Sequence, residues 1–327
     1  MGRYLLTRFI YLVSVFFIIT IILFAIFKST PGDPALMMVG SARAQVTPEV
    51  WDRIYANARV TLGLDDPLVI QYIRYLRNMV TFNFGFSIVN YRPVMDIARP
   101  ALRLTAQLNL VIIFFTFLIS IPLGITTAIR KGKAYDQIVQ IITIIGFSLP
   151  SFIFAILAIF IFAIRLNWFP ISGVSTPDFH GTAFEVVLDR LKYMAMPVIV
   201  MTFSNLAGVT RFVRASMIDA LRMDYIRTAR AKGLREKVVI YSHAFRNSLI
   251  PLVTIIVNSF IGIFAGAMIA ESIFSYTGMG NLLLQSLQRA DWAVSLAFTT
   301  FFMFISLIGF VIMDLMYLLV DPRVKLT

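Results

Sequence analysis

The sequence predicts an all-α polytopic membrane protein with six transmembrane helices. Hydrophobic residues make up 59% of the 327 positions and charged residues only 14%. A soluble domain carries about 25% charged residues, which cover its surface, so most of this chain is expected to have lipid as its solvent. Backbone groups in lipid must be hydrogen-bonded internally, and the long apolar segments are therefore expected to be helices.

Six stretches contain no Asp, Glu, Lys or Arg and reach, or nearly reach, the about 20 apolar residues that a spanning helix needs. They are Phe9–Phe27, Leu104–Ile129, Gln137–Ile164, Tyr193–Thr210, Asn247–Ala270 and Trp292–Met313. The first is longer than a typical signal-peptide core and no cleavage site of small residues follows it, which favours an uncleaved anchor. Pro122, Pro150 and Pro197 are expected to kink the second, third and fourth helices.

The distribution of basic residues predicts that both termini are cytoplasmic. With that orientation the cytoplasmic segments hold 16 Lys and Arg, whereas the short outer loops 165–192 and 271–291 hold 3 and 1. Lys and Arg resist translocation, but long segments such as 28–103 cross largely regardless of charge. The chain is therefore expected to divide into an N-terminal transmembrane helix (1–27), an extracytoplasmic insert (28–103), a five-helix core (104–320) with a cytoplasmic loop at 211–246, and a cytoplasmic tail (321–327).

The insert is expected to contain two amphipathic helices. Pro48 to Leu62 places Val50, Ile54 and Ala58 on one side, and Pro67 to Val80 places Leu68, Tyr72 and Leu76 on one face. Two interpretations stay open: a cap that packs on the membrane helices, and a docking surface for an external partner.

Several chemistries lack the residues they need. The chain has no cysteine and only two histidines, which leaves no metal centre of the usual kind. No phosphate-binding Gly-x-x-x-x-Gly-Lys-Ser/Thr motif occurs, so the chain is not expected to bind ATP or to be an enzyme. The charged residues fall at or beyond the ends of the apolar stretches, with Asp314 the nearest, which disfavours an ion-coupled carrier. Neutral candidates for lining a translocation pathway are Gln107, Asn109, Asn205 and Asn258, although hydrogen bonding between helices is the commoner use of such residues.

The cytoplasmic loop contains one distinctive segment, 224–234, with the sequence DYIRTARAKGL. Asp224 is expected to cap the N-terminus of a helix of about two turns, and Gly233 to end it. Ile226, Ala229 and Gly233 would share one face, and a helix so short needs a partner surface to be stable. The number of charges alone would favour a mere topology signal, but the order of the residues does not.

This segment and its surroundings resemble the signature loop of ATP-binding-cassette importer permeases, in the branch that serves oligopeptides, dipeptides and nickel. The resemblance extends over nearly the whole chain. It includes TPGDP at 30–34, LGLDDPL at 62–68, FGFS at 84–87, RPV at 92–94, HAFRNSLIP at 243–251, ESIF at 271–274, GMG at 278–280, DLMY at 314–317 and DPR at 321–323. The broader family has Glu-Ala-Ala where this chain has Arg227, Thr228 and Ala229.

The resemblance implies a type I importer permease fold with a large extracytoplasmic insert after the first helix. It also implies a cytoplasmic coupling helix that contacts an ATPase through Asp224, Tyr225, Ile226, Arg227, Ala229, Arg230, Gly233 and Leu234. The expected partners are a homologous sister permease, two cytosolic ATPase subunits that bind ATP and Mg²⁺, and an extracytoplasmic solute-binding protein. The location would be the inner membrane of a bacterial or archaeal cell.

Peptides are the expected substrate. Oligosaccharides or nickel complexes moved by the same machinery remain an alternative, and a secondary transporter or a membrane-embedded enzyme is less favoured.

Overall fold

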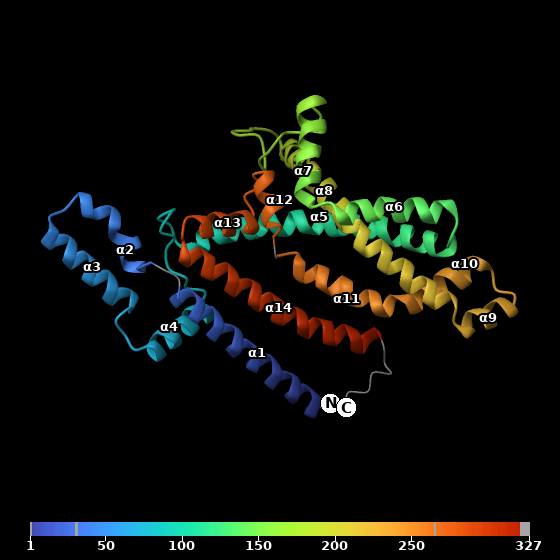
Figure 1. Ribbon diagram of the computed structural model, residues 1–327, viewed down its shortest axis with the longest axis horizontal. Helices are drawn as coiled ribbons and strands as arrows, with labels where there is room; N and C mark the ends of the chain where they lie inside the picture. The colour runs from blue at the N-terminus through green and yellow to red at the C-terminus, as the bar shows by residue number, and fades with distance from the viewer. Residues whose placement is uncertain (1, 30–31, 265, 321–327) are drawn as a thin grey trace. The chain divides into compact units, whose positions relative to one another are not determined.

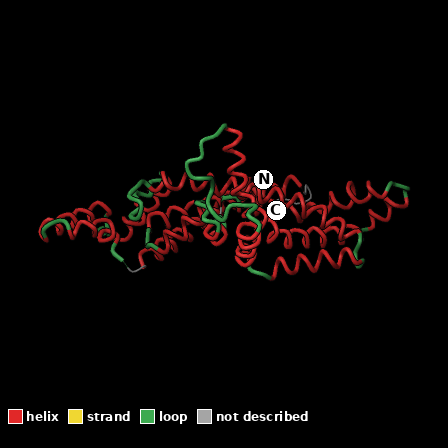
Figure 2. The backbone as a smooth tube through the Cα atoms, turned by 90° about the horizontal axis from the view of Figure 1, so that it is seen from above, coloured by secondary structure: helices red, strands yellow, loops and turns green. Residues whose placement is uncertain are grey.

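The computed structural model describes residues 2–29, 32–264 and 266–320, and these residues are almost entirely helical (Figures 1 and 2). Figure 2 shows helices joined by loops and turns, and no strand occurs in the described part of the chain. In order, the helices are α1 (Gly2–Ser29), α2 (Pro34–Val39), η1 (Gly40–Ala44), α3 (Pro48–Leu62), α4 (Leu68–Val80), α5 (Val94–Ile129), α6 (Ala134–Ser148), α7 (Ser151–Ala158), η2 (Ile159–Arg165), α8 (Ala183–Leu221), α9 (Asp224–Ala231), α10 (Glu236–Val238), η3 (Val239–Phe245), α11 (Arg246–Gly262), α12 (Met268–Ile273), α13 (Met279–Gln288) and α14 (Trp292–Val320).

The helices form two compact units. Among the described residues, the first comprises those up to Pro100 together with Leu282–Leu307, and the second comprises Ala101–Asn281 together with 308–320. This division differs from the four parts expected from the sequence, whose boundaries follow predicted membrane topology and stay a prediction.

Four helices are long and apolar enough to cross a membrane: Leu6–Ser29, Val94–Ile129, Ala183–Leu221 and Trp292–Met313. Two further pairs of helices qualify only if each bent pair counts as one span. One is α6 with α7 and η2, bent by 97°, and the other runs from Glu236 to Gly262 and is bent by 60°. The described residues therefore hold four to six candidate spans, and the predicted six is the upper end of that range.

The sharpest bend falls where a proline was expected to kink the third apolar stretch. α6 ends at Ser148, and α7 begins directly after Pro150, so one apolar stretch becomes two helices that point in different directions (Figure 1). Proline has no N–H to continue the helix, and it disfavours the helical conformation of the residue before it. By contrast, α5 and α8 continue through Pro122 and Pro197.

The core of the second unit gathers around the C-terminal half of α8. Val213 and Met217 are fully buried there, beside Ile125 of α5 and Leu252 of α11. Gly124 allows α5 to approach α8 closely, because a Cβ atom at this position would lie 2.5 Å from Cβ of Val213 and 3.0 Å from the carbonyl oxygen of Thr210. A larger residue here would force the two helices apart.

The insert contains the two predicted helices, and α3 has the predicted bounds. On α3, Ala58 is buried as expected, but Val50 is exposed. On α4 the predicted face is partly wrong: Leu68 is exposed, and the residues buried are Tyr75 and Met79. The difference arises because α4 packs against α1 and α14 of the same unit, and these neighbours select its buried side.

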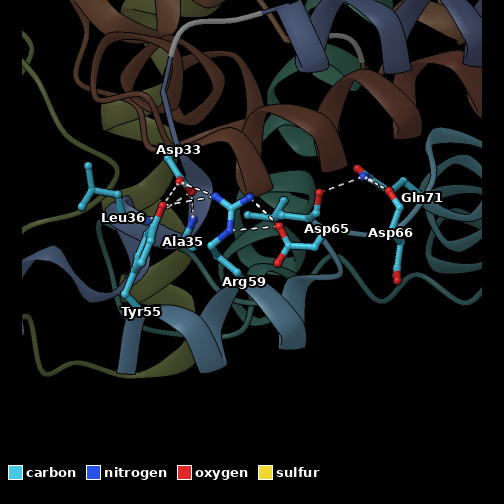
Figure 3. Close-up of polar contacts among 9 residues, drawn as sticks. Asp33, Ala35, Leu36, Tyr55, Arg59, Asp65, Asp66 and Gln71 are labelled. Atoms are coloured by element: carbon cyan, nitrogen blue, oxygen red, sulfur yellow. Dashed lines mark hydrogen bonds and ion pairs between the residues drawn. The ribbon is translucent and has the colours of Figure 1, made fainter. Parts of the chain in front are cut away.

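A polar clasp holds the start of α2 to α3 (Figure 3). The Asp33 carboxylate caps α2 by accepting a hydrogen bond from the Ala35 N–H at 2.8 Å. It also accepts hydrogen bonds from the Tyr55 hydroxyl and from Nη1 of Arg59, and Arg59 reaches on to Asp65 at 2.6 Å. Burial alone would raise the pKa of Asp33, but these donors and the Arg59 cation outweigh it, and the pKa is lowered.

Candidate translocation cavity and coupling helix

A cavity of about 520 Å³ lies in the second unit between α5, α8 and α11. Its wall is uncharged and mixes amide and hydroxyl side chains with aliphatic and aromatic ones. The lining residues are Asn109, Ile112, Ile113, Thr116, Phe117, Asn205, Gly208, Val209, Phe212, Ile255, Asn258, Ser259 and Gly262. Three of the four residues chosen from the sequence as pathway candidates are therefore brought together here.

The fourth candidate, Gln107, is exposed and does not line this cavity. Two residues further along α5, Asn109 donates hydrogen bonds to the carbonyl oxygens of Gly262 and Ile263, at 3.1 and 2.9 Å. These bonds satisfy carbonyl groups at the end of α11, where no further helical turn follows. Asn109 therefore has the helix-to-helix role that was the alternative interpretation, while it also forms part of the wall.

The chemistry of the wall suits a polar solute of no particular charge. Side-chain amides and hydroxyls can donate and accept hydrogen bonds, and no carboxylate or cation fixes one charge type. A fixed charge in such a cavity would hold an ion of opposite charge strongly and delay its release. The wall therefore fits passage better than tight binding.

The second candidate site is the short helix α9, and the side of α9 expected to contact a partner is buried within this chain. Ile226 is fully buried and Ala229 is 5% exposed, both within the core that also contains Met217, Val239 and Ile240. Ile226 and Ala229 were expected to contact an ATPase, but this chain's own α8 and η3 cover them. The partner surface that so short a helix needs is supplied from within the chain.

The ends of α9 agree only in part with the sequence prediction. The N-cap residue is Met223, and Asp224 lies in the first turn, so its expected capping role is wrong. Gly233 follows the C-cap residue Lys232 with φ of 76°, a left-handed conformation that favours glycine. This position ends the helix as predicted, and Gly233 is exposed rather than part of a buried face.

The surface that α9 leaves open is both apolar and basic. Met223, Tyr225 and Leu234 are at least 40% exposed, although such side chains usually prefer the interior. Arg227 is also exposed, and Arg230 pairs with Glu236 at 2.7 Å on the surface. An exposed aromatic residue among arginines is a composition typical of protein interfaces.

The sequence did not predict that two acidic residues are buried, because both lie at the ends of apolar stretches. Asp136, in the first turn of α6, is 1% exposed and forms a two-point ion pair with Arg214 of α8. Glu271 of α12 is also 1% exposed; it accepts hydrogen bonds from the Thr105 hydroxyl at 2.9 Å and from the Asn281 N–H at 3.0 Å. An acid directly beside an apolar stretch is the only sequence signal of such burial, and it does not reveal the partner.

Comparison with known proteins places this architecture among transport components. The family described as "Binding-protein-dependent transport system inner membrane component" matches residues 120–326, and the corresponding N-terminal family matches residues 1–109. The chain is 36% identical to the oligopeptide transport system permease protein AppB of Bacillus subtilis, over 99% of this chain and 100% of that protein. It is 32% identical to the dipeptide transport system permease protein DppB of the same organism, over 100% of this chain and 99% of that protein.

A solved structure shares the fold. It is that of the MetNI methionine ABC transporter in inward facing conformations, with a TM-score of 0.51 and 16% sequence identity. The match covers 67% of this chain and 96% of that one. The likeness supports the predicted importer permease fold, and a third of this chain lies outside it.

Proposed function

This chain belongs to the family of inner membrane components of binding-protein-dependent transport systems, and on that basis we propose that it is the permease subunit of an ATP-driven peptide importer. The observation that carries the proposal is the full-length similarity to an oligopeptide permease and a dipeptide permease of Bacillus subtilis. The uncharged amide-containing cavity supports it, since peptides present amide groups and vary in side-chain charge. In this proposal the chain has six transmembrane spans, a large extracytoplasmic insert after the first span, and both termini in the cytoplasm.

In this proposal the chain contributes half of the translocation pathway and a sister permease contributes the other half. An extracytoplasmic binding protein delivers the peptide. Two cytosolic subunits bind ATP and Mg²⁺ and hydrolyse the nucleotide, so this chain needs no cofactor and has no catalytic role. The free energy of nucleotide binding favours one of two arrangements of the membrane helices, and differential contacts in those arrangements provide the coupling.

The coupling contact is made by the open surface of α9. Its inner face is fixed to α8 and η3 through Ile226 and Ala229, so a push on α9 is transmitted directly into a helix that lines the cavity. Tyr225 is the central anchor of the outer surface, because a large amphipathic side chain gains most from being covered by a partner. Arg227 contributes charge at the edge of the same surface.

The test compares substitutions on the two faces of α9 in a co-expressed transporter. Tyr225→Ala is expected to reduce recovery of the ATPase subunits in a pull-down at least tenfold and to leave the stability of the chain unchanged. Ala229→Glu places an unpaired charge in the core and is expected to lower both. The matched control is Ile171→Ala, an exposed apolar residue in the loop before α8, which should change neither.

Arg227→Gln separates charge from packing. If Tyr225→Ala retains the ATPase subunits and peptide-stimulated ATP hydrolysis while Arg227→Gln loses them, the contact depends on charge and the proposed anchor is wrong. If neither substitution alters recovery, α9 is not the contact.

A further inference from the structure

Helix α4 has an apolar face that nothing in the described structure covers. Leu68, Val69, Ile70, Ile73 and Val80 are all exposed, with Val69 at 69% and Ile73 at 59%. Val69 and Ile73 are four residues apart, and Val80 is seven further on, so the three share one side of the helix. In water such a face would be unfavourable, because each large aliphatic side chain gains roughly 1.5–3 kcal/mol from leaving water.

The adjoining face of α4 packs against two candidate membrane-spanning helices of the same unit. The Tyr72 hydroxyl is 2.8 Å from that of Thr20 on α1, and the Tyr72 ring lies 5.4 Å from that of Phe24. Met79 is fully buried in a cluster that includes Met303 of α14. α4 is thus packed laterally against candidate membrane spans.

The helical rise gives the distance of these contacts from the neighbouring ends of α1 and α14. Thr20 lies nine residues before Ser29, the end of α1, and at 1.5 Å per residue this is about 14 Å. Met303 lies eleven residues after Trp292, the start of α14, which is about 16 Å. The Phe27 and Trp292 rings, 6.2 Å apart, show that these two ends lie level.

The two distances agree and place the contacts of α4 inside the hydrocarbon. The span Leu6–Ser29 is about 36 Å long at that rise, and the hydrocarbon core is about 30 Å thick. If the span is centred, Thr20 is about 11 Å below the hydrocarbon surface. α4 itself has 13 residues and is about 20 Å long, too short to cross the membrane.

We infer that α4 is a membrane-embedded interfacial helix, whose face formed by Val69, Ile73 and Val80 contacts lipid acyl chains in the leaflet that the C-terminal end of α1 reaches. Lipid is the expected neighbour of this face because α1, against which α4 packs, is itself hardly covered by protein. Only 6% of the most apolar part of α1 is buried, and Ile18, Ile21 and Ile22 are more than half exposed. The face of α4 extends this lipid-facing wall.

The polar residues of α4 fit this position. Arg74 is paired with Asp66 at 2.5 Å and also donates to the Leu62 carbonyl oxygen, so its charge is compensated at the start of the helix. Arg77 is exposed one turn after Ile73, and its apolar stem can lie along lipid while the guanidinium points away from the acyl chains. The inference does not depend on which solute is transported or on which side of the membrane the insert lies.

Single cysteines provide the test, because the chain has none of its own. Cysteine at Ile73, labelled with a small fluorophore, is compared with cysteine at Asn57, an exposed residue of α3. Each variant is purified within the co-expressed transporter and reconstituted in nanodiscs that contain lipids with a quencher on the acyl chain. Quenching by the lipid is expected to be at least threefold stronger at Ile73 than at Asn57, and quenching by dissolved iodide at least threefold weaker. Val69 should behave like Ile73.

Two outcomes would overturn the inference. Quenching at Ile73 by iodide but not by lipid would place α4 in water. Protection of Ile73 from both quenchers would show that another protein covers this face. Labelling at Tyr75, which is buried within the chain, gives the reference value for such protection.

Discussion

The ion pair between Asp136 and Arg214 is expected to carry an unusually large share of stability for a polar contact. The Asp136 carboxylate accepts hydrogen bonds from Nε and Nη2 of Arg214, both at 2.7 Å, and from the Gly132 N–H at 2.9 Å. Asp136 is 1% exposed and the Arg214 side chain 19%, so water cannot replace either partner readily. The pair joins the start of α6 to α8.

Asp136→Asn removes the charge and keeps the size of the side chain. Loss of one partner from a buried pair costs about 3–5 kcal/mol, because the remaining charge stays buried and uncompensated. The same change in the exposed pair of Arg230 and Glu236, whose side chains are 49% and 56% exposed, is expected to cost at most about 1 kcal/mol. Glu236→Gln is therefore the matched control.

The measurement is unfolding by SDS in mixed micelles, followed by helical circular dichroism. Asp136→Asn should lower the midpoint several times more than Glu236→Gln does. The double variant Asp136→Asn/Arg214→Met should be more stable than the sum of its single effects predicts, since no unpaired charge remains. Equal midpoints for Asp136→Asn and Glu236→Gln would refute the assigned importance of the buried pair.

Three further predictions concern other parts of the chain. Gly124→Ala should destabilise the chain by about 1–3 kcal/mol, because the added Cβ would overlap Val213. Gly208→Ala should be neutral or slightly stabilising, because no other atom lies within 4 Å of its added Cβ. Thermal unfolding of both variants measures the difference, and equal effects would contradict the prediction. The lowered pKa of Asp33 means that its clasp stabilises the insert above pH 3.8 and is lost as the pH falls through the folded-state pKa. With Trp168 and Trp292 replaced by Phe, the fluorescence of Trp51, which stacks on Tyr55, should change below pH 3.8, and Asp33→Asn should abolish that transition. Single cysteines at Asn57 and Lys237 should react with an impermeant reagent in intact cells at the first position only, and labelling of the second alone would reverse the predicted orientation.

Local patterns predicted α3, α4 and α9, but not α2 and η1 of the insert. Pro48 at the start and Gly63 just after the end fixed the bounds of α3, and Gly233 ended α9, because proline and glycine act through their own backbone conformations. The amide residues of the cavity were also found from the sequence, since polar side chains in an apolar helix need a polar environment. Gln107 shows the limit of that reasoning, because its exposure depends on which neighbours α5 has.

Composition alone determined that this chain is apolar and helical, because the need to satisfy backbone hydrogen bonds in lipid depends on no particular partner. The transport role followed from the resemblance of its motifs to a known permease family. Only the tertiary structure decided which side of each amphipathic helix is buried. A helical pattern defines an apolar face without saying whether a partner, the chain itself or lipid will cover it. Ile226 and Ala229 turned inward because α8 and η3 lie beneath α9, and Ile73 turned outward because α1 and α14 already occupy the other side of α4.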